Sequence, residues 1–266
     1  MLKGKIALIT GAGRGLGRAI AEAMSREGAK ISMVSRSMNE LKAAADKIRG
    51  HGGSVLEIKG DISDEASVSE MVSKTKEAFS TVDILVNNAA VIGPATILTT
   101  PRTQDWYHTL NVNLMGAYRL ILSVLPMMIK QKSGKIINIT SGLGQRPYPR
   151  FCAYGVSKAG LIQLTQSLSE ELREWNVQVN AINPGVMNTH MQSDIRKFDE
   201  RTLGSEVYQR FHMLYEQGML KDPKEVTPLA VFLASAEADH LTGHNGTPEY
   251  YQHLGFEMHG SSISKS

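Results

Sequence analysis

The sequence predicts an α/β fold, a doubly wound parallel sheet with helices on both faces. Short β-branched runs alternate with longer amphipathic segments, several runs are apolar at their centres, and no Pro-, Gly- or Ser-rich linker divides the chain. Strands covered by helices on both faces are expected to be apolar in this way, and their crossovers are right-handed. We therefore expect a single domain over residues 1–243.

Six runs predict strands, and the first, fourth, fifth and sixth are almost wholly apolar at their centres: 6–10, 30–35, 54–60, 82–87, 135–140 and 177–182. Amphipathic segments between them predict helices over 15–28, 38–50, 64–80, 104–131 and 153–175. Two regions depart from this alternation. Residues 187–218 mix charges with aromatic side chains and predict a substrate lid, and residues 244–266 predict an atypical C-terminal tail with a disordered Ser/Gly-rich end.

Composition limits the classes of partner. The 29 basic and 26 acidic side chains leave a net charge of only +3, which gives no reason to expect a nucleic-acid partner. Cys152 is the single cysteine, so we expect no intrachain disulfide and a cytoplasmic location. No signal-peptide layout and no run of ~20 apolar residues is present, so we expect no membrane partner. His240 and His244 lack an evident third ligand, so no metal site is expected.

Glycines interrupt the junction between the first strand and the first helix, at Gly11, Gly15 and Gly17. Glycine allows positive φ and lets a ligand approach the backbone, and a helix N-terminus attracts phosphate. The spacing differs from the common G-x-G-x-x-G form, and a tight strand–helix turn would also use glycine. The pattern favours a nucleotide-phosphate site.

A tyrosine and a lysine lie one helical turn apart, at Tyr154 and Lys158, and so share one helix face. A phenol has an ordinary pKa of about 10, and a nearby ammonium would lower it. Tyr154 would then exchange protons as a general acid and base. Ser141, thirteen residues earlier at a strand end, could hydrogen-bond the same substrate oxygen. Alone, such a pair is common on amphipathic helices.

Together these motifs, with the sequence NNAA at 87–90, resemble the short-chain dehydrogenase/reductase family in its single-domain branch, over roughly residues 3–243. The resemblance implies a Rossmann-type fold and an oxidoreductase with four catalytic residues, Asn113, Ser141, Tyr154 and Lys158. Lys158 would also hold the nicotinamide ribose, and Asn113 would support a water. The implied cofactor-binding residues are Gly11, Arg14, Gly15, Leu16, Gly17, Ser35, Arg36, Asp61, Ile62, Asn88, Ala89, Tyr154, Lys158, Pro184, Gly185 and Thr189.

The residues at the end of the second strand favour NADP(H). NAD-preferring sites place an acidic residue there, whereas this chain has Ser35 followed by Arg36. No carboxylate is expected close enough to repel a 2′-phosphate, and Arg36 and Arg14 can contact it. The alternative is that both arginines are solvated surface charges.

The resemblance places substrate contacts after Ser141 and after 184–185, at Leu143, Gln145, Tyr148 and Met191. This mainly apolar set predicts a ketone or secondary alcohol with a hydrophobic body. An alternative is a 3-oxoacyl-[acyl-carrier-protein] or acyl-thioester reductase, which the acidic stretch SLSEELREWN disfavours. A non-catalytic cofactor-binding regulator is a third reading.

Helices 104–131 and 153–175 suggest pairing in a homodimer or homotetramer. The stretch after Gly243 departs from the family pattern, which leaves the last strand and the tetramer contact in doubt.

Overall fold

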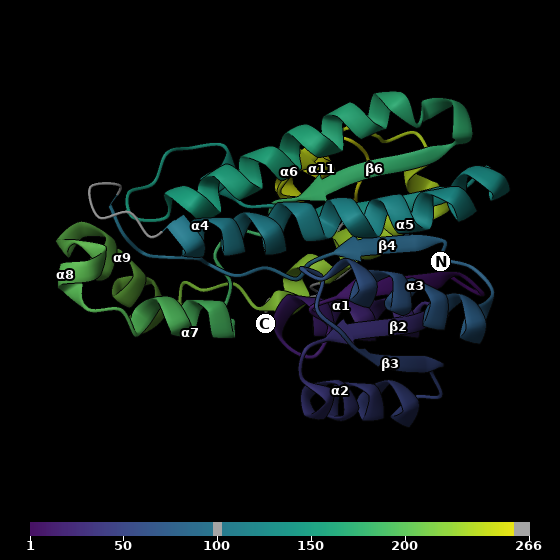
Figure 1. Cartoon of the computed structure of the whole chain (residues 1–266), viewed down its shortest axis with the longest axis horizontal. Coiled ribbons are helices and arrows are strands. Elements are labelled where there is room, and N and C mark those ends of the chain that lie inside the picture. Colours follow the sequence, from purple (N-terminus) through teal and green to yellow (C-terminus); the bar gives the residue numbers. More distant parts are fainter. Residues whose placement is uncertain (98–102, 258–266) are drawn as a thin grey trace, which may run out of the picture.

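A seven-stranded sheet in the order β3-β2-β1-β4-β5-β6-β7 forms the centre of the computed structural model, which describes residues 1–97 and 103–257. All neighbouring strands are parallel, which confirms the predicted doubly wound sheet (Figure 1). The strands are β1 (Ile6–Thr10), β2 (Lys30–Ser35), β3 (Val55–Lys59), β4 (Ile84–Asn87), β5 (Gly134–Ile139), β6 (Val177–Ile182) and β7 (Asn245–Gly246).

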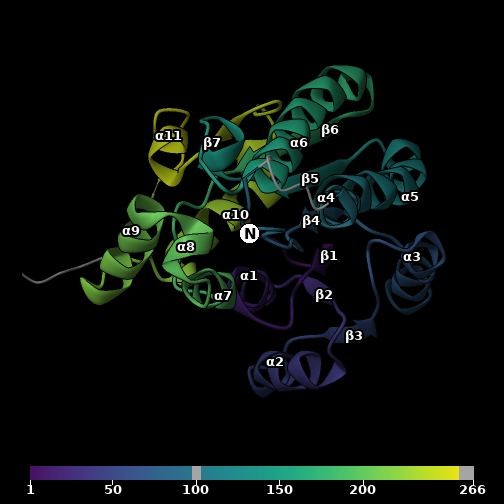
Figure 2. The same cartoon turned by 60° about the vertical axis from the view of Figure 1, so that its left-hand side comes forward.

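Helices cover both faces of this sheet. One face carries α1 (Gly15–Arg26), α2 (Met38–Gly50) and α10 (Thr227–Ala234). The other carries α3 (Glu65–Phe79), α5 (Gly116–Gln131) and α6 (Cys152–Glu171), which Figure 2 shows side by side. The remaining helices are α4 (Thr103–Leu110), α7 (His190–Arg196), α8 (Glu200–Leu203), α9 (Ser205–Glu216) and α11 (Pro248–Gln252).

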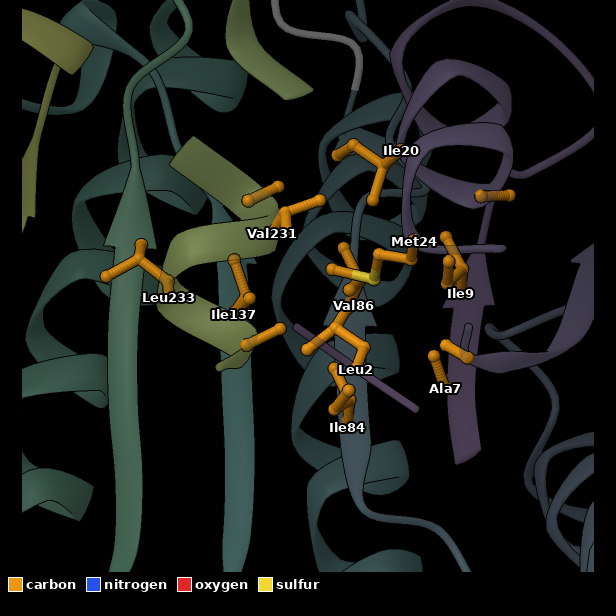
Figure 3. Packing of buried hydrophobic residues seen from close by; sticks show 14 of the residues in the cluster. Leu2, Ala7, Ile9, Ile20, Met24, Ile84, Val86, Ile137, Val231 and Leu233 are labelled. Carbon is orange, nitrogen blue, oxygen red and sulfur yellow. The ribbon is translucent and has the colours of Figure 1, made fainter. Parts of the chain in front are cut away.

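The strands are apolar at successive positions because their two faces pack into different cores. In β1, Ala7 and Ile9 join the core under α1 and α10, whereas Leu8 joins the core under α3 and α5. Ile84 and Leu85 of β4 divide in the same way. Figure 3 shows the first core, where side chains of α1 and α10 meet the inner strands. Side chains on a strand alternate between faces, so both alternating sets must be apolar here.

The strand order places a crevice at the carboxyl ends of β1 and β4. The chain leaves β1 toward β2 on one side and reaches β4 on the other, and α/β proteins bind ligands at such a switch point. Figure 1 shows α7, α8 and α9 beyond this end of the sheet. Residues that follow β1, β4, β5 and β6 therefore converge there.

Within residues 1–97 and 103–257, one helical run is long and apolar enough to cross a bilayer by length and composition, Thr103–Gln131, which contains an 18-residue window of mean hydropathy 1.6. Its buried residues Leu120, Ile121 and Val124 pack against the sheet, as expected for the core helix of a globular protein. Asn111–Met115 within it is π-helical, a feature that often marks a functional site.

The tail contains regular structure where the sequence had left the last strand in doubt. Asn245 and Gly246 form β7 beside β6, and α11 follows. Tyr251 is fully buried, and its hydroxyl donates to the carbonyl oxygens of Ala181 (2.9 Å) and His244 (3.1 Å). The predicted disordered end falls mostly on residues 258–266, outside the described residues.

Candidate active site

A cavity of about 700 Å³ opens at the carboxyl ends of the strands, and the glycine turn after β1 forms part of its wall. Gly11 and Gly15 have φ of +63° and +55°, conformations that other residues rarely adopt. A Cβ on Gly15 would lie 3.5 Å from Cγ2 of Thr189, so it would narrow the cavity between these residues. The turn therefore leaves backbone accessible at the N-terminus of α1, as a bound phosphate requires.

Asn88 locks this turn from behind. Its Nδ2 donates to the carbonyl oxygens of Thr10 (2.8 Å) and Gly11 (3.3 Å). The Thr10 hydroxyl accepts from the backbone N–H groups of Asn88 (3.0 Å) and Ala89 (3.1 Å). Gly17 does not line the cavity: a Cβ there would meet Nδ2 of Asn88 and the Gly11 carbonyl oxygen, so glycine allows close packing.

Tyr154 and Ser141 meet at the inner end of the cavity. Burial raises the pKa of Tyr154 to about 12, and a hydrogen bond with the Ser141 side chain offsets part of that effect. The sequence predicted that a neighbouring ammonium and a bound, positively charged nicotinamide lower this pKa, and that prediction concerns the loaded enzyme. Nζ of Lys158 donates to the Ile139 carbonyl oxygen, and the hydrogen bond that opposes the effect of burial on Tyr154 comes from Ser141. The phenol therefore holds its proton at neutral pH.

Lys158 is almost fully buried, at 2% exposed. Its Nζ lies 5.6 Å from the centre of the Tyr154 ring and donates to the Ile139 carbonyl oxygen at 2.7 Å. Burial lowers its pKa to about 8. An ammonium carries three donors, so beyond the one that Ile139 accepts two N–H bonds are left to serve a ligand in the cavity.

Asn113 lies behind the cavity wall rather than in it. Its Oδ1 accepts from the Val91 N–H (2.8 Å), and its Nδ2 donates to the Val91 carbonyl oxygen (2.9 Å) and to the Ser157 hydroxyl (3.0 Å). The π-helical turn presents the side chain to these partners. Asn113 thus ties the chain after β4 to α6, which carries Tyr154 and Lys158.

The opposite end of the cavity is lined by Ser35, Arg36, Asp61 and Ile62, as the resemblance implied, and also by Glu40. The expectation that no carboxylate lies close to this end is wrong. Oε1 of Glu40 lies 3.2 Å from Nη1 of Arg14. The sequence did not predict this contact, because Glu40 and Arg14 are 26 residues apart and only the packing of α2 brings the carboxylate to the glycine turn.

The loop after β6 closes one side of the cavity with Pro184, Gly185 and Thr189. Lys221 supports this loop: its N–H donates to Val186 (3.0 Å), and its carbonyl oxygen accepts from Asn188 (2.9 Å). Nζ of Lys221 pairs with Oε1 of Glu249 at 3.0 Å, which links the loop to α11 in the tail. Hydrogen bonds from Thr247, from its own backbone and from Lys221 lower the pKa of Glu249 to about 2.

A family model described as short chain dehydrogenase matches residues 5–200. The chain belongs to the short-chain dehydrogenase family. It is 37% identical over 243 residues to Oxidoreductase UcpA of Salmonella typhimurium, covering 91% of this chain and 92% of that protein. It is 33% identical over 242 residues to 3-oxoacyl-[acyl-carrier-protein] reductase FabG of Thermotoga maritima, covering 91% of this chain and 95% of that protein.

Solved structures of the family superpose closely on the chain. Levodione reductase has a TM-score of 0.86 at 27% identity, over 96% of this chain and 100% of that one. NAD⁺-bound xylitol dehydrogenase has a TM-score of 0.85 at 28% identity, over 92% and 98%. An NAD(P)-dependent gluconate 5-dehydrogenase from Beutenbergia cavernae with bound NADP has a TM-score of 0.82 at 32% identity, over 92% and 95%.

This short-chain dehydrogenase is therefore an oxidoreductase that acts on alcohol or ketone groups with a nicotinamide cofactor. The residues present fit such a cofactor. The cavity runs from Ser35 to Tyr154, the glycine turn leaves backbone accessible, and the buried amine of Lys158 has donors to spare. Lys158, Thr189 and the glycine turn would hold the cofactor.

Two of the four residues expected to contact the substrate of this dehydrogenase line the cavity, and two do not. Leu143 and Met191 line the cavity. Gln145 and Tyr148 do not, because Gln145 is exposed after a 3₁₀ turn and the Tyr148 ring packs on Phe151, 6.1 Å between ring centres. Sequence reasoning missed several wall residues: Val91, Ile92, Gly93, Val112, Ile139, Thr140, Phe151, His190, Gln192, Asp194 and Ile195. Phe151 carries no motif, and nothing in the sequence signals it.

Proposed function

We propose that this short-chain dehydrogenase is an NADP(H)-dependent carbonyl reductase, or secondary-alcohol dehydrogenase in reverse, with Tyr154 as general acid and base. One observation carries this proposal. A buried phenol with a raised pKa contacts Ser141 inside a cavity that also holds the buried amine of Lys158. The phenol is protonated at neutral pH, so it has a proton to give to a carbonyl oxygen as negative charge develops there, and a neighbouring ammonium makes that transfer easier.

A reduced nicotinamide held in the cavity would be the source of the hydride that reaches the carbonyl carbon. The Ser141 and Tyr154 hydroxyls donate hydrogen bonds to the carbonyl oxygen, and the Tyr154 proton then passes to that oxygen. Lys158, mostly charged at neutral pH because its pKa is about 8, stabilises the phenolate that remains. In the reverse direction the phenolate takes the alcohol proton. Asn113, through Val91 and Ser157, keeps α6 in place while this happens.

The wall near Tyr154 favours a substrate with a hydrophobic body. Leu143, Phe151, Met191 and Phe211 supply apolar surface there. The likeness to FabG of Thermotoga maritima favours a second candidate, an acyl-thioester reductase. At the end of α6 and in the turn after it, however, Glu171 and Glu174 lie near Glu170, which already pairs with Arg173 at 2.7 Å, and this acidic surface would repel an acidic carrier.

The choice of NADP(H) rests on the cations at the far end of the cavity. Ser35 occupies the position where NAD-preferring relatives would carry a carboxylate, and Arg36 is exposed beside it. Arg14 is half-exposed and lines the same end. A guanidinium forms strong, paired hydrogen bonds with a phosphate group, so these side chains suit a 2′-phosphate.

We further propose a cytoplasmic homodimer. The lone Cys152 favours a reducing compartment. Tyr118 and Leu122 lie one turn apart on α5 and are 38% and 49% exposed, so they form a contiguous apolar patch on that helix. A two-fold axis beside α5 and α6 would bury them, with a tetramer as the larger alternative.

Replacing Tyr154 by Phe tests the function. The purified variant should lose about 10³-fold in kcat for NADPH oxidation with ketones, sugars or acyl thioesters, because the proton donor is gone. Its Kd for NADPH, from nicotinamide fluorescence, should stay within about twofold of wild type, since the phenol is only one contact of the cofactor.

Tyr215→Phe provides the matched control, because Tyr215 is exposed on α9 outside the cavity. It should leave both quantities unchanged. A Tyr154→Phe variant that keeps a tenth or more of the wild-type rate contradicts the proposed acid–base role. No turnover by wild type with any carbonyl class would favour the regulator.

A further inference from the structure

Glu40 is placed where it can read the adenosine ribose of a nucleotide. It lies in the first turn of α2, which Ser37 caps by accepting from the Glu40 N–H. A Cβ built on Gly13 would lie 3.3 Å from Oε2 of Glu40 and 3.2 Å from the Ser35 hydroxyl oxygen. The carboxylate and that hydroxyl therefore face the same small space beside the glycine turn.

The charges at this end of the cavity balance. Arg14 pairs with Glu40 through a single N–O contact at 3.2 Å, and both side chains are partly exposed, at 49% and 35%. Burial acts to raise the pKa of Asp61, but hydrogen bonds from Ser63 and the charge of Arg36 together lower it, so a second cation lies near a second carboxylate. Two cations therefore lie with two carboxylates at this end of the cavity, and the carboxylates reduce the positive charge that a 2′-phosphate would meet.

The two carboxylates are not equivalent. Oδ1 of Asp61 accepts from the Ser63 N–H (2.9 Å) and hydroxyl (2.7 Å), so Asp61 is held by its own loop. Glu40 has one side-chain contact in the described structure, to Arg14, and that pair is the weak, exposed kind that a better anion displaces. Glu40 is thus the group whose contacts must change when a 2′-phosphate binds.

We propose that Glu40 sets the choice between NADP(H) and NAD(H), an inference that rests on the proposed function. With NADP(H), Arg14 leaves Glu40 for the 2′-phosphate, and the Glu40 carboxylate opposes that phosphate by repulsion. With NAD(H), Glu40 accepts a hydrogen bond from the ribose 2′-hydroxyl, in place of the acidic residue that Ser35 replaces. The enzyme therefore binds both cofactors, and Glu40 limits its preference for NADP(H).

Fluorescence titration of NADPH and NADH against wild type and Glu40→Gln tests this without turnover. The variant should bind NADPH about fivefold more tightly, because a charge beside the phosphate is removed. It should bind NADH about fivefold more weakly, because an amide oxygen accepts less strongly than a carboxylate. Glu70→Gln is the control, since Glu70 forms an exposed pair with Lys74 on α3 away from the cavity.

Glu40→Ala and calorimetry with 2′,5′-ADP, which lacks the nicotinamide, give a second reading should Glu40→Gln fold poorly. The alanine variant should also bind 2′,5′-ADP more tightly than wild type. Kd values that stay within twofold for both cofactors overturn the proposal. So does weaker NADPH binding by Glu40→Gln, which would mean that Glu40 holds Arg14 in place for the phosphate.

The proposed function is judged separately, by the wild-type ratio of the two Kd values. Tighter binding of NADH than NADPH by wild type would contradict the NADP(H) preference, whereas the change caused by the Glu40 substitution alone decides the role of Glu40.

Discussion

Replacing Lys158 by Met should change how stability depends on pH. Folding lowers the pKa of this buried amine from 10.5 to about 8. Below about pH 8 both states carry the charge, and the folded protein bears a cost of about 3 kcal/mol for burying it. As pH rises from 8 to 10.5 the folded amine is neutral while the unfolded one is still charged, so this cost disappears.

The unfolding free energy of wild type should therefore rise relative to Lys158→Met by about 2.5 kcal/mol between pH 7 and pH 10. Loss of the hydrogen bond to the Ile139 carbonyl oxygen lowers the unfolding free energy of the variant equally at both pH values, so its contribution cancels in this difference. Urea unfolding of the cofactor-free protein at equal concentration measures it, with the exposed Lys130→Met as control. If the difference in unfolding free energy between wild type and Lys158→Met changes by less than about 0.5 kcal/mol from pH 7 to pH 10, the lowered pKa of Lys158 is refuted.

Three further outcomes follow from the tail and from α5. Glu249→Gln should lower the unfolding free energy at pH 7 by no more than about 1 kcal/mol, because Glu249 is mostly exposed. In thermal unfolding this loss should shrink as the pH falls from 4.5 through about 2, because the native carboxylate becomes protonated there. Tyr251→Phe should cost about 1–2 kcal/mol in urea unfolding, because two carbonyl oxygens lose a buried donor; unchanged stability would contradict those contacts. Leu122→Glu should convert a dimer to a monomer in light scattering, and a wild-type monomer would contradict the proposed interface.

Local patterns predicted most of the fold. The strand and helix segments follow from periodicity, since β1 spans the predicted 6–10 and β6 the predicted 177–182. Ends differed by a few residues: α6 stops at Glu171, and a separate 3₁₀ turn follows it. The two-residue β7 could not be predicted, because a strand that short has no periodicity and exists only through pairing with β6.

The candidate site was predictable where spacing along one element determines position. Tyr154 and Lys158 share a helix face whatever the rest of the chain does. Glu40 and Arg14 are 26 residues apart and meet only because α2 packs beside the glycine turn. The raised pKa of Tyr154 in the cofactor-free protein could not be predicted for the same reason, since its burial depends on Phe151 and other side chains that no motif marks.

The ion pair between Lys221 and Glu249 connects the C-terminal segment to the loop that forms one wall of the cavity. Clipping by a protease just after Thr247 would remove Glu249 together with the buried Tyr251, and Lys221 would lose the carboxylate that anchors it beneath Gly185. Cleavage at a position distant from Tyr154 in the sequence would then weaken the affinity for the cofactor. A protein fused to the C-terminus would disturb the same loop if it displaced Glu249 or Tyr251.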